Sequence, residues 1–337
     1  MASDPDDDPR IGDISEGAVL RAILERTPQA SGTILGPGDD AAVIAAPSAS
    51  VVATTDTLVD GPDFRTAWSS GYDLGWKAAA VNLADVAAMG AGPTALLVAL
   101  AVPREVRLSF VAALADGFRE ACEALAPGCA VVGGDLTVSD VLMIAVTALG
   151  DLDGRTAVTR SGARSGDIVA LAGELGAAAA GLEVLFDTFR DAETPIAVDA
   201  DALDDAARHA LSRQLRPQPP IALGKVAADA GATAMMDVSD GLALDAGRLA
   251  DASEVTIDFS AAALDALAFG GDRARGLAGG EDHGLLATFP ADRPLPDGFR
   301  RIGAVTARTT DGVLLDGAAV PRSGWDPYRD WDGVAAG

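Results

Sequence analysis

One alanine-rich stretch, Lys77 to Gly92 (KAAAVNLADVAAMGAG), constrains the fold of this chain more than any other segment. Seven of its residues are alanine, the residue with the highest helix propensity, so the stretch predicts a helix. The spacing of Lys77, Asn82 and Asp85 puts three polar groups on one face of that helix. Burial of an ionised Asp85 is costly unless a cation or hydrogen bonds meet it, whereas a solvent-facing Asp85 needs neither.

The length of 337 residues predicts two domains, and a hydrophobic content of 49% excludes disorder for most of the chain. We expect a disordered acidic tail at 1–14, an N-terminal domain at 15–150 and a C-terminal domain at 151–337. Strands alternate with helices up to about residue 150, which favours an α/β or α+β class. No apolar run reaches the roughly 18 residues of a membrane helix. The acidic start lacks the regions of a signal peptide, so we expect a cytoplasmic protein.

The net charge of −25, from 25 basic and 50 acidic side chains, argues against binding of nucleic acid or anionic membranes through a general field. Nucleotides remain compatible with it, because bound divalent cations reverse the local sign. The two cysteines, Cys122 and Cys129, are too few for a disulfide framework and have no metal-site spacing.

Hydrophobic periodicity and turn residues predict further elements. We expect helices at 15–26, 107–125, 221–230 and in segments ending near 186 and 214. Strands are expected at 51–54, 93–102, 130–132, 141–149, 168–172 and 232–236, near Val255 and after Gly280, with a hairpin around Asp311 and Gly312.

Carboxylates recur at predicted strand or helix ends beside Gly, Ser or Thr. Each alone is more often a cap or turn residue. If they converge, they repel by about 4 kcal/mol per pair at about 4 Å and an effective dielectric constant of about 20, so they require cations. Oxygen ligands without His or Cys favour Mg²⁺, which usually bridges to phosphates. The candidates are Asp39, Asp40, Asp56, Asp85, Asp135, Asp237, Asp240 and Asp282.

Two glycine pairs, 133–134 and 279–280, would let the backbone approach a bulky polyphosphate. The chain has no Walker A sequence and no protein-kinase glycine loop, so ATP chemistry here would use a different cradle. Only two histidines occur, which argues against a Ser–His–Asp enzyme. We expect His209 on the surface, while His283 is open between packing and a site. A phosphate acceptor is already an anion and needs alignment and charge neutralisation rather than a general base.

Seven motifs occur in one order across nearly the whole chain: GDDAAV, TTDTLVDG, KAAAVNLADVAAMGA, GGDLT, TRSGA, DVSDGL and GGED. Together they resemble the thiamine-monophosphate kinase family, within the superfamily of aminoimidazole-ribonucleotide synthetase-like ATP enzymes. The resemblance implies a two-domain fold of that type, with an N-terminal mixed sheet that pairs in a homodimer and a C-terminal α/β domain. It also implies ATP-dependent phosphorylation of thiamine monophosphate to thiamine diphosphate with several Mg²⁺ ions, and leaves a K⁺ requirement open.

Matching the motifs residue by residue extends this implication to a site. Asp85 and Asp240 would be the catalytic residues. The metal ligands would be Asp40, Thr54, Thr55, Asp56, Asp85, Asp135, Asp237 and Asp240; the ATP contacts Gly134, Asp135, Arg160 and Ser239; and the thiamine contacts Asp63, Glu281 and Tyr328. Tyr328 or a nearby Trp would stack on the pyrimidine ring, whereas simple packing is the alternative for these aromatics.

Three departures from the family pattern affect this site. Leu136 replaces a usual Thr, His283-Gly284 replaces a usual Tyr-Glu pair, and Asp63-Phe64 stands where His-Phe is frequent. Among relatives, the hydrogenase-maturation type needs a C-terminal Cys and the selenophosphate type an N-terminal Cys or selenocysteine, which this chain lacks. A purine-synthesis ligase and a catalytically inactive acidic metal- or nucleotide-binding protein remain as alternatives.

Overall fold

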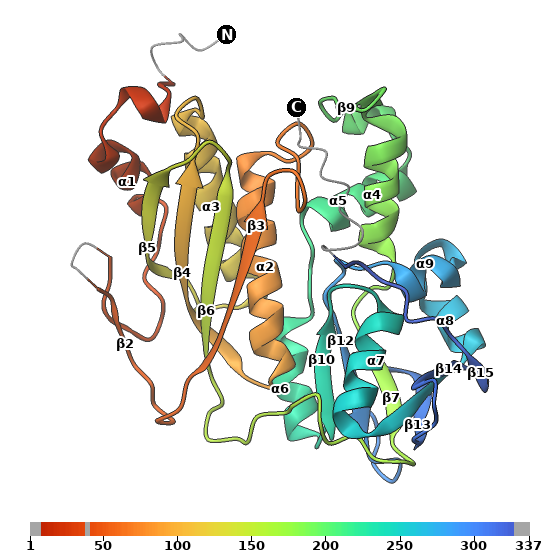
Figure 1. Ribbon diagram of the computed structural model, residues 1–337. Helices are drawn as coiled ribbons and strands as arrows, with labels where there is room; N and C mark the ends of the chain where they lie inside the picture. The colour runs from red at the N-terminus through yellow and green to blue at the C-terminus, as the bar shows by residue number, and fades with distance from the viewer. Residues whose placement is uncertain (1–7, 38–40, 327–337) are drawn as a thin grey trace.

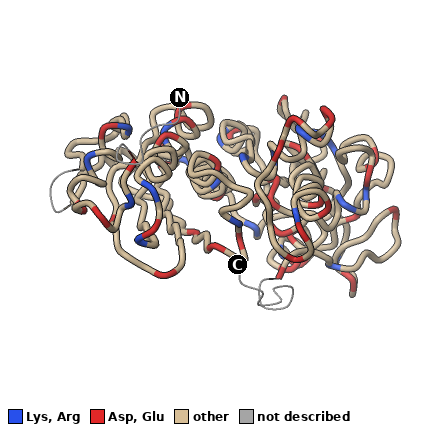
Figure 2. The backbone as a smooth tube through the Cα atoms, turned by 90° about the horizontal axis from the view of Figure 1, so that it is seen from above, with Lys and Arg blue, Asp and Glu red and all other residues tan. Residues whose placement is uncertain are grey.

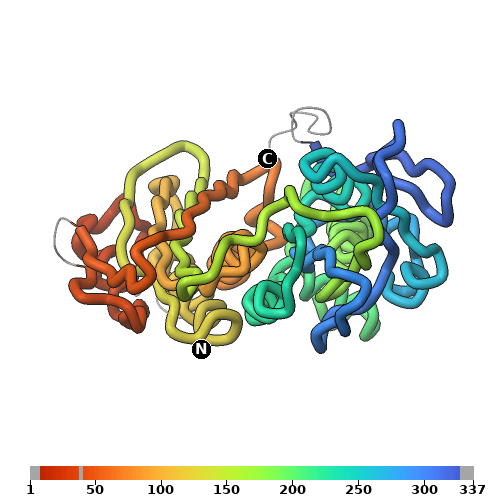
Figure 3. Tube along the Cα trace, turned by 90° about the horizontal axis from the view of Figure 1, so that it is seen from below, coloured from red at the N-terminus to blue at the C-terminus, as the bar shows by residue number. Residues whose placement is uncertain are grey.

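Two β-sheets lie side by side in the computed structural model, with helix α2 (Gly71–Ala88) between them (Figure 1). The structure describes residues 8–37 and 41–326. Seen from below, the N-terminal half and the C-terminal half occupy opposite sides of the molecule, joined by the segment after residue 151 (Figure 3). In chain order the first half contains η2 (Ile11–Asp13), α1 (Glu16–Leu24), β1 (Thr33–Leu35), β2 (Val43–Ile44), β3 (Val52–Val59), α2, β4 (Gly92–Val102), α3 (Leu108–Leu125), β5 (Val131–Val138) and β6 (Met143–Asp151).

The N-terminal sheet has the strand order β3-β6-β4-β5. Strand β6 is antiparallel to both of its neighbours, and β4 and β5 are parallel. Helices α2 and α3 cover one face, where Leu96, Ile144 and Val146 are buried. The opposite face carries Leu97 and Met143, which are each 37% exposed. Helices therefore cover one side only, while the opposite face is covered at one end by Ala30, Ala42 and Ile44 and is otherwise open.

Helix α2 confirms the helix predicted from the alanine-rich stretch. Ser70 and Asp73 form a capping box at its start, in which each side chain bonds to the backbone N–H of the other residue. The helix ends at Ala88, shortly before Gly90 with its φ of +74°. Most of its residues are buried, because α3 and the N-terminal sheet cover one side while Ala88 packs against the C-terminal core.

Glycines allow α2 and α3 to pack backbone to backbone. A Cβ atom added at Gly75 would lie 2.0 Å from the carbonyl oxygen of Leu114, and one at Gly117 would lie 2.1 Å from that of Tyr72. Such distances are far below van der Waals contact, so either side chain would push the two helices apart.

We expect Gly75→Ala to lower the free energy of unfolding by about 1–3 kcal/mol or more, because overpacking forces backbone shifts. Urea denaturation followed by circular dichroism measures this change. Gly17→Ala is the matched control, since Gly17 lies on exposed helix α1 with no atom closer than Arg21 Nη1 at 4.0 Å. That control is expected to be neutral or stabilising. Equal stabilities of the two variants would contradict the close contact.

The C-terminal sheet has the strand order β10-β12-β7-β13-β11-β14-β15. Its neighbours are antiparallel except for the parallel pair β11–β14. Met236 and Leu286 face helix α7, whereas Met235 and Leu285 face α6 and the end of α2. In chain order this half contains β7 (Ile168–Ala172), α4 (Ala177–Thr188), β8 (Arg190–Asp191), β9 (Thr194–Pro195), η3 (Ala200–Ala202), α5 (Asp205–Leu215), α6 (Ile221–Asp229), β10 (Ala234–Val238), α7 (Leu242–Ser253), β11 (Val255–Phe259), α8 (Ala261–Leu267), η4 (Phe269–Gly271), α9 (Arg273–Ala278), β12 (Gly284–Phe289), β13 (Arg300–Ala307), β14 (Val313–Leu315) and β15 (Ala318–Ala319).

The disordered acidic tail expected at 1–14 is contradicted by the structure for residues 8–14. Residues 1–7 lie outside the described residues, but Asp8 accepts hydrogen bonds from the backbone N–H (2.9 Å) and hydroxyl (2.7 Å) of Ser109. These bonds satisfy the start of α3 and hold the pKa of Asp8 below its ordinary value. The segment from Asp8 to the short helix η2 is therefore part of the fold.

Two strand predictions also need correction. Strand β5 does not end at the Gly133-Gly134 pair but runs through it, and a Cβ atom at Gly134 would lie 1.9 Å from the carbonyl oxygen of Val98. The glycine therefore serves the pairing with β4. The hairpin is the β14–β15 pair, and its turn is Asp316-Gly317, not Asp311-Gly312. Both turn residues have positive φ, as a two-residue hairpin turn requires.

No helix in the described part of the chain is long and apolar enough to cross a membrane.

Candidate active site

Carboxylates from three elements converge where the two sheets meet at helix α2. Asp56 of β3 and Asp85 of α2 come from the N-terminal half, and Asp237 of β10 from the C-terminal half. Strand alternation explains how they are aimed. Asp237 lies on the same face of β10 as Met235, which packs toward α2, and Asp56 lies on the same face of β3 as buried Leu58. Three of the eight acids predicted from strand and helix ends therefore meet across the two halves.

Asp85 lies in the middle of this group. Its carboxylate accepts a hydrogen bond from the hydroxyl of Thr54 at 2.8 Å. Burial, together with the negative charges of Asp237 and Asp56, raises the pKa of Asp85 to about 7. These contacts favour Asp85 as a residue that binds a cation over Asp85 as a solvent-facing residue of an amphipathic helix.

Asp56 is positioned by the same helix. Its backbone N–H donates to the side-chain oxygen of Asn82 at 3.1 Å, and the Asn82 amide in turn donates to the carbonyl of Ala78 at 2.9 Å. Asn82 is only 1% exposed, so it ties β3 to α2. Burial raises the pKa of Asp56, and the charges of Asp237 and Asp240 add to this effect.

Asp240 lies on the loop between β10 and α7, where a buried acid organises the backbone. Asp245, which is fully buried, accepts hydrogen bonds from the backbone N–H groups of Ser239 (3.1 Å) and Asp240 (3.0 Å). Arg248 pairs with Asp240 at 2.5 Å and with Asp245 at 2.7 Å. Burial raises the pKa of Asp245 to about 6. No sequence motif points to Asp245 or Arg248, although their i, i+3 spacing is typical of a helical ion pair.

A cavity of about 560 Å³ opens beside these acids, between the two halves. Its walls include three residues of the predicted site: Asp63 and Glu281, expected to contact thiamine, and Ser239, expected to contact ATP. Asp63 accepts a hydrogen bond from the backbone N–H of Val59 at 2.8 Å, and burial raises its pKa. Trp68, Phe186 and Trp325 supply aromatic walls.

Lys77 supplies the positive charge at the cavity. Its side chain is 5% exposed, forms an ion pair with Glu281 and donates to the carbonyl of Gln214 at 3.2 Å. This pairing lowers the pKa of Glu281 against the opposing effect of burial. The buried lysine therefore joins α2 to the C-terminal half and keeps Glu281 ionised.

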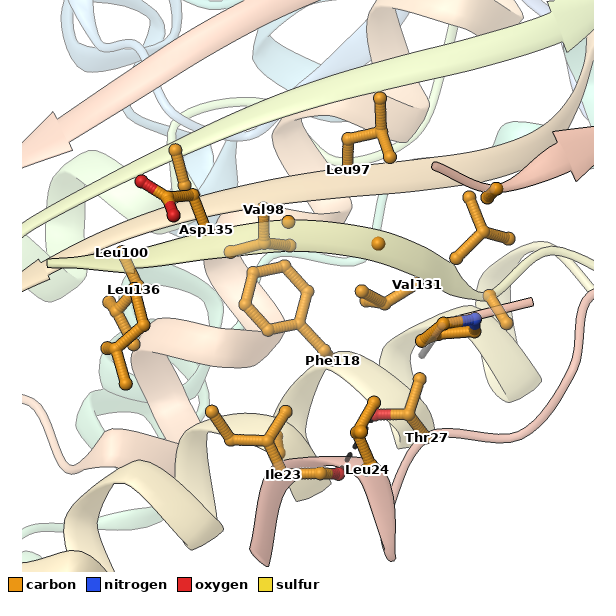
Figure 4. A pocket seen from close by; sticks show the side chains of 18 of the residues that line it. Ile23, Leu24, Thr27, Leu97, Val98, Leu100, Phe118, Val131, Asp135 and Leu136 are labelled. Atoms are coloured by element: carbon orange, nitrogen blue, oxygen red, sulfur yellow. Dashed lines mark hydrogen bonds between the residues drawn. The ribbon is translucent and has the colours of Figure 1, made fainter. Parts of the chain in front are cut away.

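Other predicted residues lie apart from the convergent acids. The Thr55 hydroxyl donates to the carbonyl of Val146 at 2.9 Å and accepts a hydrogen bond from the hydroxyl of Thr147 on the neighbouring strand. Asp135 lies on β5, where it is paired with Ala99 of β4. Figure 4 shows Asp135 and Leu97 on one side of the sheet and Leu100, Leu136 and Phe118 on the other. Thr55 and Asp135 therefore belong to the open face, next to a groove of about 820 Å³ that also includes Gly134.

Arg160 is exposed on the segment joining the two halves, and its carbonyl accepts the hydroxyl of Ser253 at 2.8 Å. Asp40 and Tyr328 lie outside the described residues. Trp325 takes part in the cavity, and its backbone N–H donates to the carbonyl of Asp240 at 2.8 Å. Asp282 is a helix cap, since it accepts the N–H groups of Gly176 (2.5 Å) and Ala178 (2.8 Å) at the start of α4.

The two histidines have different surroundings. His209 lies near Glu174 at 3.1 Å and stacks on Phe269 with 5.6 Å between ring centroids. His283 is 5% exposed, with its Nδ1 3.1 Å from a carboxylate oxygen of Asp237. Burial alone would lower the pKa of His283, but the bond to Asp237 reverses this, so its pKa is raised.

The convergent acids fit a magnesium–phosphate complex better than a metal held by protein alone. Within the described ranges, no group of three or more His, Cys, Asp or Glu side chains is arranged to hold a metal ion. Mg²⁺ in nucleotide enzymes is typically held by one or two carboxylates together with phosphate oxygens and water. Burial and the negative charges of Asp237 and Asp56 disfavour the Asp85 anion, and a bound cation would offset both effects. Acidic positions are spread over both halves of the molecule (Figure 2).

Comparison with known proteins agrees with this fold. Residues 38–152 match the family described as AIR synthase related protein, N-terminal domain. The thiamine-monophosphate kinase of Mycobacterium tuberculosis (strain CDC 1551 / Oshkosh) is 42% identical over 336 residues, covering 96% of this chain and 92% of the relative.

Among solved structures, thiamine-monophosphate kinase from Stenotrophomonas maltophilia K279a has a TM-score of 0.76 at 32% identity, covering 91% of this chain and 98% of that one. AaThiL complexed with AMPPCP and TMP has a TM-score of 0.72 at 31% identity, covering 94% and 98%.

The paired sheets and the facing carboxylates between them define an enzyme of the AIR synthase related class. Within that class, the identity to relatives is high over nearly the full length of both chains. The chain belongs to the thiamine-monophosphate kinase family.

Proposed function

We propose that this protein transfers the γ-phosphoryl group of ATP to thiamine monophosphate, forming thiamine diphosphate and ADP. The observation that supports this most is the convergence of Asp56, Asp85 and Asp237 beside a cavity with Glu281 and Trp325 on its wall. The site thus offers a place for a polyphosphate with its metal ions and, next to it, a half-apolar space for an organic cation. AaThiL complexed with AMPPCP and TMP is a structural relative with both kinds of ligand.

The proposal assigns the two halves different tasks. Residues 15–150 hold the nucleotide and metal ions, and residues 151–337 complete the nucleotide site and bind substrate. The proposed metal ligands are Asp40, Thr54, Thr55, Asp56, Asp85, Asp135, Asp237 and Asp240; Gly134, Asp135, Arg160 and Ser239 contact ATP; and Asp63, Glu281 and Tyr328 contact thiamine, with Trp325 added from the cavity. Asp85 and Asp240 are the proposed catalytic residues.

The proposed chemistry is direct in-line transfer without a covalent enzyme intermediate. The acceptor is a phosphate oxygen that already carries negative charge, so the chain needs no general base. Bound Mg²⁺ supplies charge neutralisation at the phosphoryl oxygens. Asp85 and Asp240 fix the geometry from the two halves, so alignment of the two anions depends on the contact between the halves. Glu281, held ionised by Lys77, faces the cavity and suits the cationic thiazolium or the aminopyrimidine.

Incubation of the purified chain with ATP, Mg²⁺ and thiamine monophosphate tests the proposal. We expect thiamine diphosphate and ADP in equal amounts, measured by chromatography. Aminoimidazole-type substrates offered in place of thiamine monophosphate test the purine-synthesis ligase alternative. Formation of neither product by a folded preparation would instead support a nucleotide-binding protein without activity.

The two free buried cysteines and the use of ATP are in keeping with a cytoplasmic place of action, which we propose as well.

We further propose that the open face of the N-terminal sheet pairs with a second copy of the chain. Leu97 and Met143 are each 37% exposed there, and Leu97, Ala99 and Ala145 give this face apolar side chains that a second sheet could cover.

A charge at Leu97 should prevent this pairing. We expect Leu97→Asp to halve the molar mass measured by light scattering, because two buried carboxylates would face an apolar interface. Ile196→Asp is the matched control. Ile196 follows β9 in the C-terminal half and is 42% exposed. A Leu97→Asp protein with the mass of the wild-type dimer, or a monomeric wild type, would contradict the proposed interface.

A further inference from the structure

His283 occupies a constrained position between the two halves of the acid cluster. It immediately precedes β12, and its backbone N–H donates to the carbonyl of Val238 at 3.0 Å. Asp237 is paired with Leu285 in the same ladder, so the His283 side chain lies next to the Asp237 side chain. Its φ is +51°, a left-handed conformation that few residues adopt without cause. The backbone therefore places the ring at Asp237.

The two ring nitrogens differ in their surroundings. Nδ1 lies 3.1 Å from Oδ2 of Asp237, whereas Nε2 is buried and has no hydrogen-bond partner among the described residues. The charged groups that act on the ring are Asp237, Glu281 and Lys77, and the ring itself acts on Asp56 and Asp85 of the facing half. The imidazole thus stands between the carboxylates of both halves.

We propose that His283 is a positioning residue, in which Nδ1–H donates to one carboxylate oxygen of Asp237 and leaves the other oxygen free for a divalent cation. This rests on the proposed function only in the identity of Asp237 as a metal ligand. A carboxylate with one oxygen fixed by an N–H donor loses less rotational freedom when it binds a metal. The His-Gly pair at 283–284 departs from the pattern that the sequence motifs resemble, so this device is a property of this chain's own residues.

Two substitutions distinguish the roles of the two nitrogens. In His283→Asn, the side-chain amide nitrogen lies close to where Nδ1 was, and asparagine tolerates the left-handed conformation. In His283→Gln, the amide reaches the position of Nε2 instead. The probe is Mn²⁺ alone, measured by the loss of its free-ion electron paramagnetic resonance signal on the full chain. We expect His283→Asn to bind Mn²⁺ within about threefold of the wild type and His283→Gln to bind it about 10- to 100-fold more weakly.

His209→Asn is the matched control, because His209 is the other histidine and contacts Glu174 and Phe269 away from the acids. Its Mn²⁺ affinity should equal that of the wild type. Circular dichroism melting identifies any variant that does not fold. Equal affinity of the Asn and Gln variants, whether both strong or both weak, would overturn the proposal.

The tautomer of the wild-type ring is a test that needs no substitution at His283. With ¹⁵N-labelled histidine the chain gives two ring spin systems, which His209→Asn assigns. We expect a protonated Nδ1 in the Mn²⁺-free, Mg²⁺-bound protein, and an unprotonated Nδ1 there would overturn the proposal. Mn²⁺ binding and the tautomer are measured without thiamine monophosphate, so they succeed or fail separately from the kinase assay.

Discussion

Asp85→Asn is expected to lower the turnover number of thiamine diphosphate formation by at least about 100-fold while the protein remains folded. The substitution removes a negative charge at nearly constant volume from the centre of the acid cluster. Loss of one preorganised electrostatic contact to a reacting group typically costs about 10²–10³ in turnover number. The hydrogen bond from Thr54 can still form, because the asparagine side chain keeps one oxygen acceptor.

The same substitution should not lower the thermal stability of the protein. Burial and two neighbouring carboxylates disfavour the Asp85 anion, so the neutral amide is expected to leave the melting temperature of the metal-free protein unchanged or higher. Asp265→Asn is the matched control, because Asp265 is exposed and pairs only with Arg273 in the described structure. It should change neither property. Near-normal turnover by folded Asp85→Asn would count against Asp85 as a catalytic residue.

A second large effect is expected on stability: the metal-free protein should lose stability as the pH rises, and Mg²⁺ with ATP should remove this loss. The pKa of Asp85 rises from 3.8 to about 7 on folding, so between these values the native state binds more protons than the unfolded state. Its unfolding free energy therefore falls as pH rises through this window. The loss for the metal-free protein between pH 5 and pH 8 is expected to be about 2–3 kcal/mol, and the raised pKa values of Asp56 and Asp63 act in the same direction.

Saturating Mg²⁺ with ATP should remove this loss, because cations favour the ionised carboxylates and bind the native state selectively. Urea denaturation at pH 5, 6, 7 and 8, with chelator or with Mg²⁺ and ATP, measures both curves. The Asp85→Asn variant should show a flatter metal-free curve. A metal-free protein whose stability rises steadily from pH 5 to pH 8 would be inconsistent with a repulsive buried cluster.

Local sequence patterns were sufficient for much of the fold and for the centre of the site. The helix around Asp85 and the strand 168–172 were predicted within a few residues, because alanine content and apolar runs set them locally. Asp56, Asp85 and Asp237 come together because β3 and β10 both pack against α2, the helix that carries Asp85. The residue assignments for ATP, thiamine and metal still depend on the resemblance and remain predictions.

Several side-chain positions in the site depend on contacts between segments far apart in the sequence, and local sequence patterns do not predict these contacts. Thr54 and Thr55 are neighbours, yet alternation along β3 sends one to α2 and the other to the open face. Asp245 supports the Asp240 loop through backbone N–H groups, which leave no sequence pattern beyond its spacing to Arg248. His283 reaches Asp237 only because β10 and β12 are paired in one register.

Sequence similarity in helix α2 reports the fold of a protein of this architecture and says little about the reaction that it performs. Its small residues are enclosed on every side by the two sheets and by α3, so few substitutions are compatible with the fold whatever reaction the protein performs. Divergent descendants that had exchanged one substrate for another would keep this alanine-rich signature. The information about chemistry in the helix is concentrated in Lys77, Asn82 and Asp85, and a change at one of these three would mark a shift in activity that the rest of the helix would conceal.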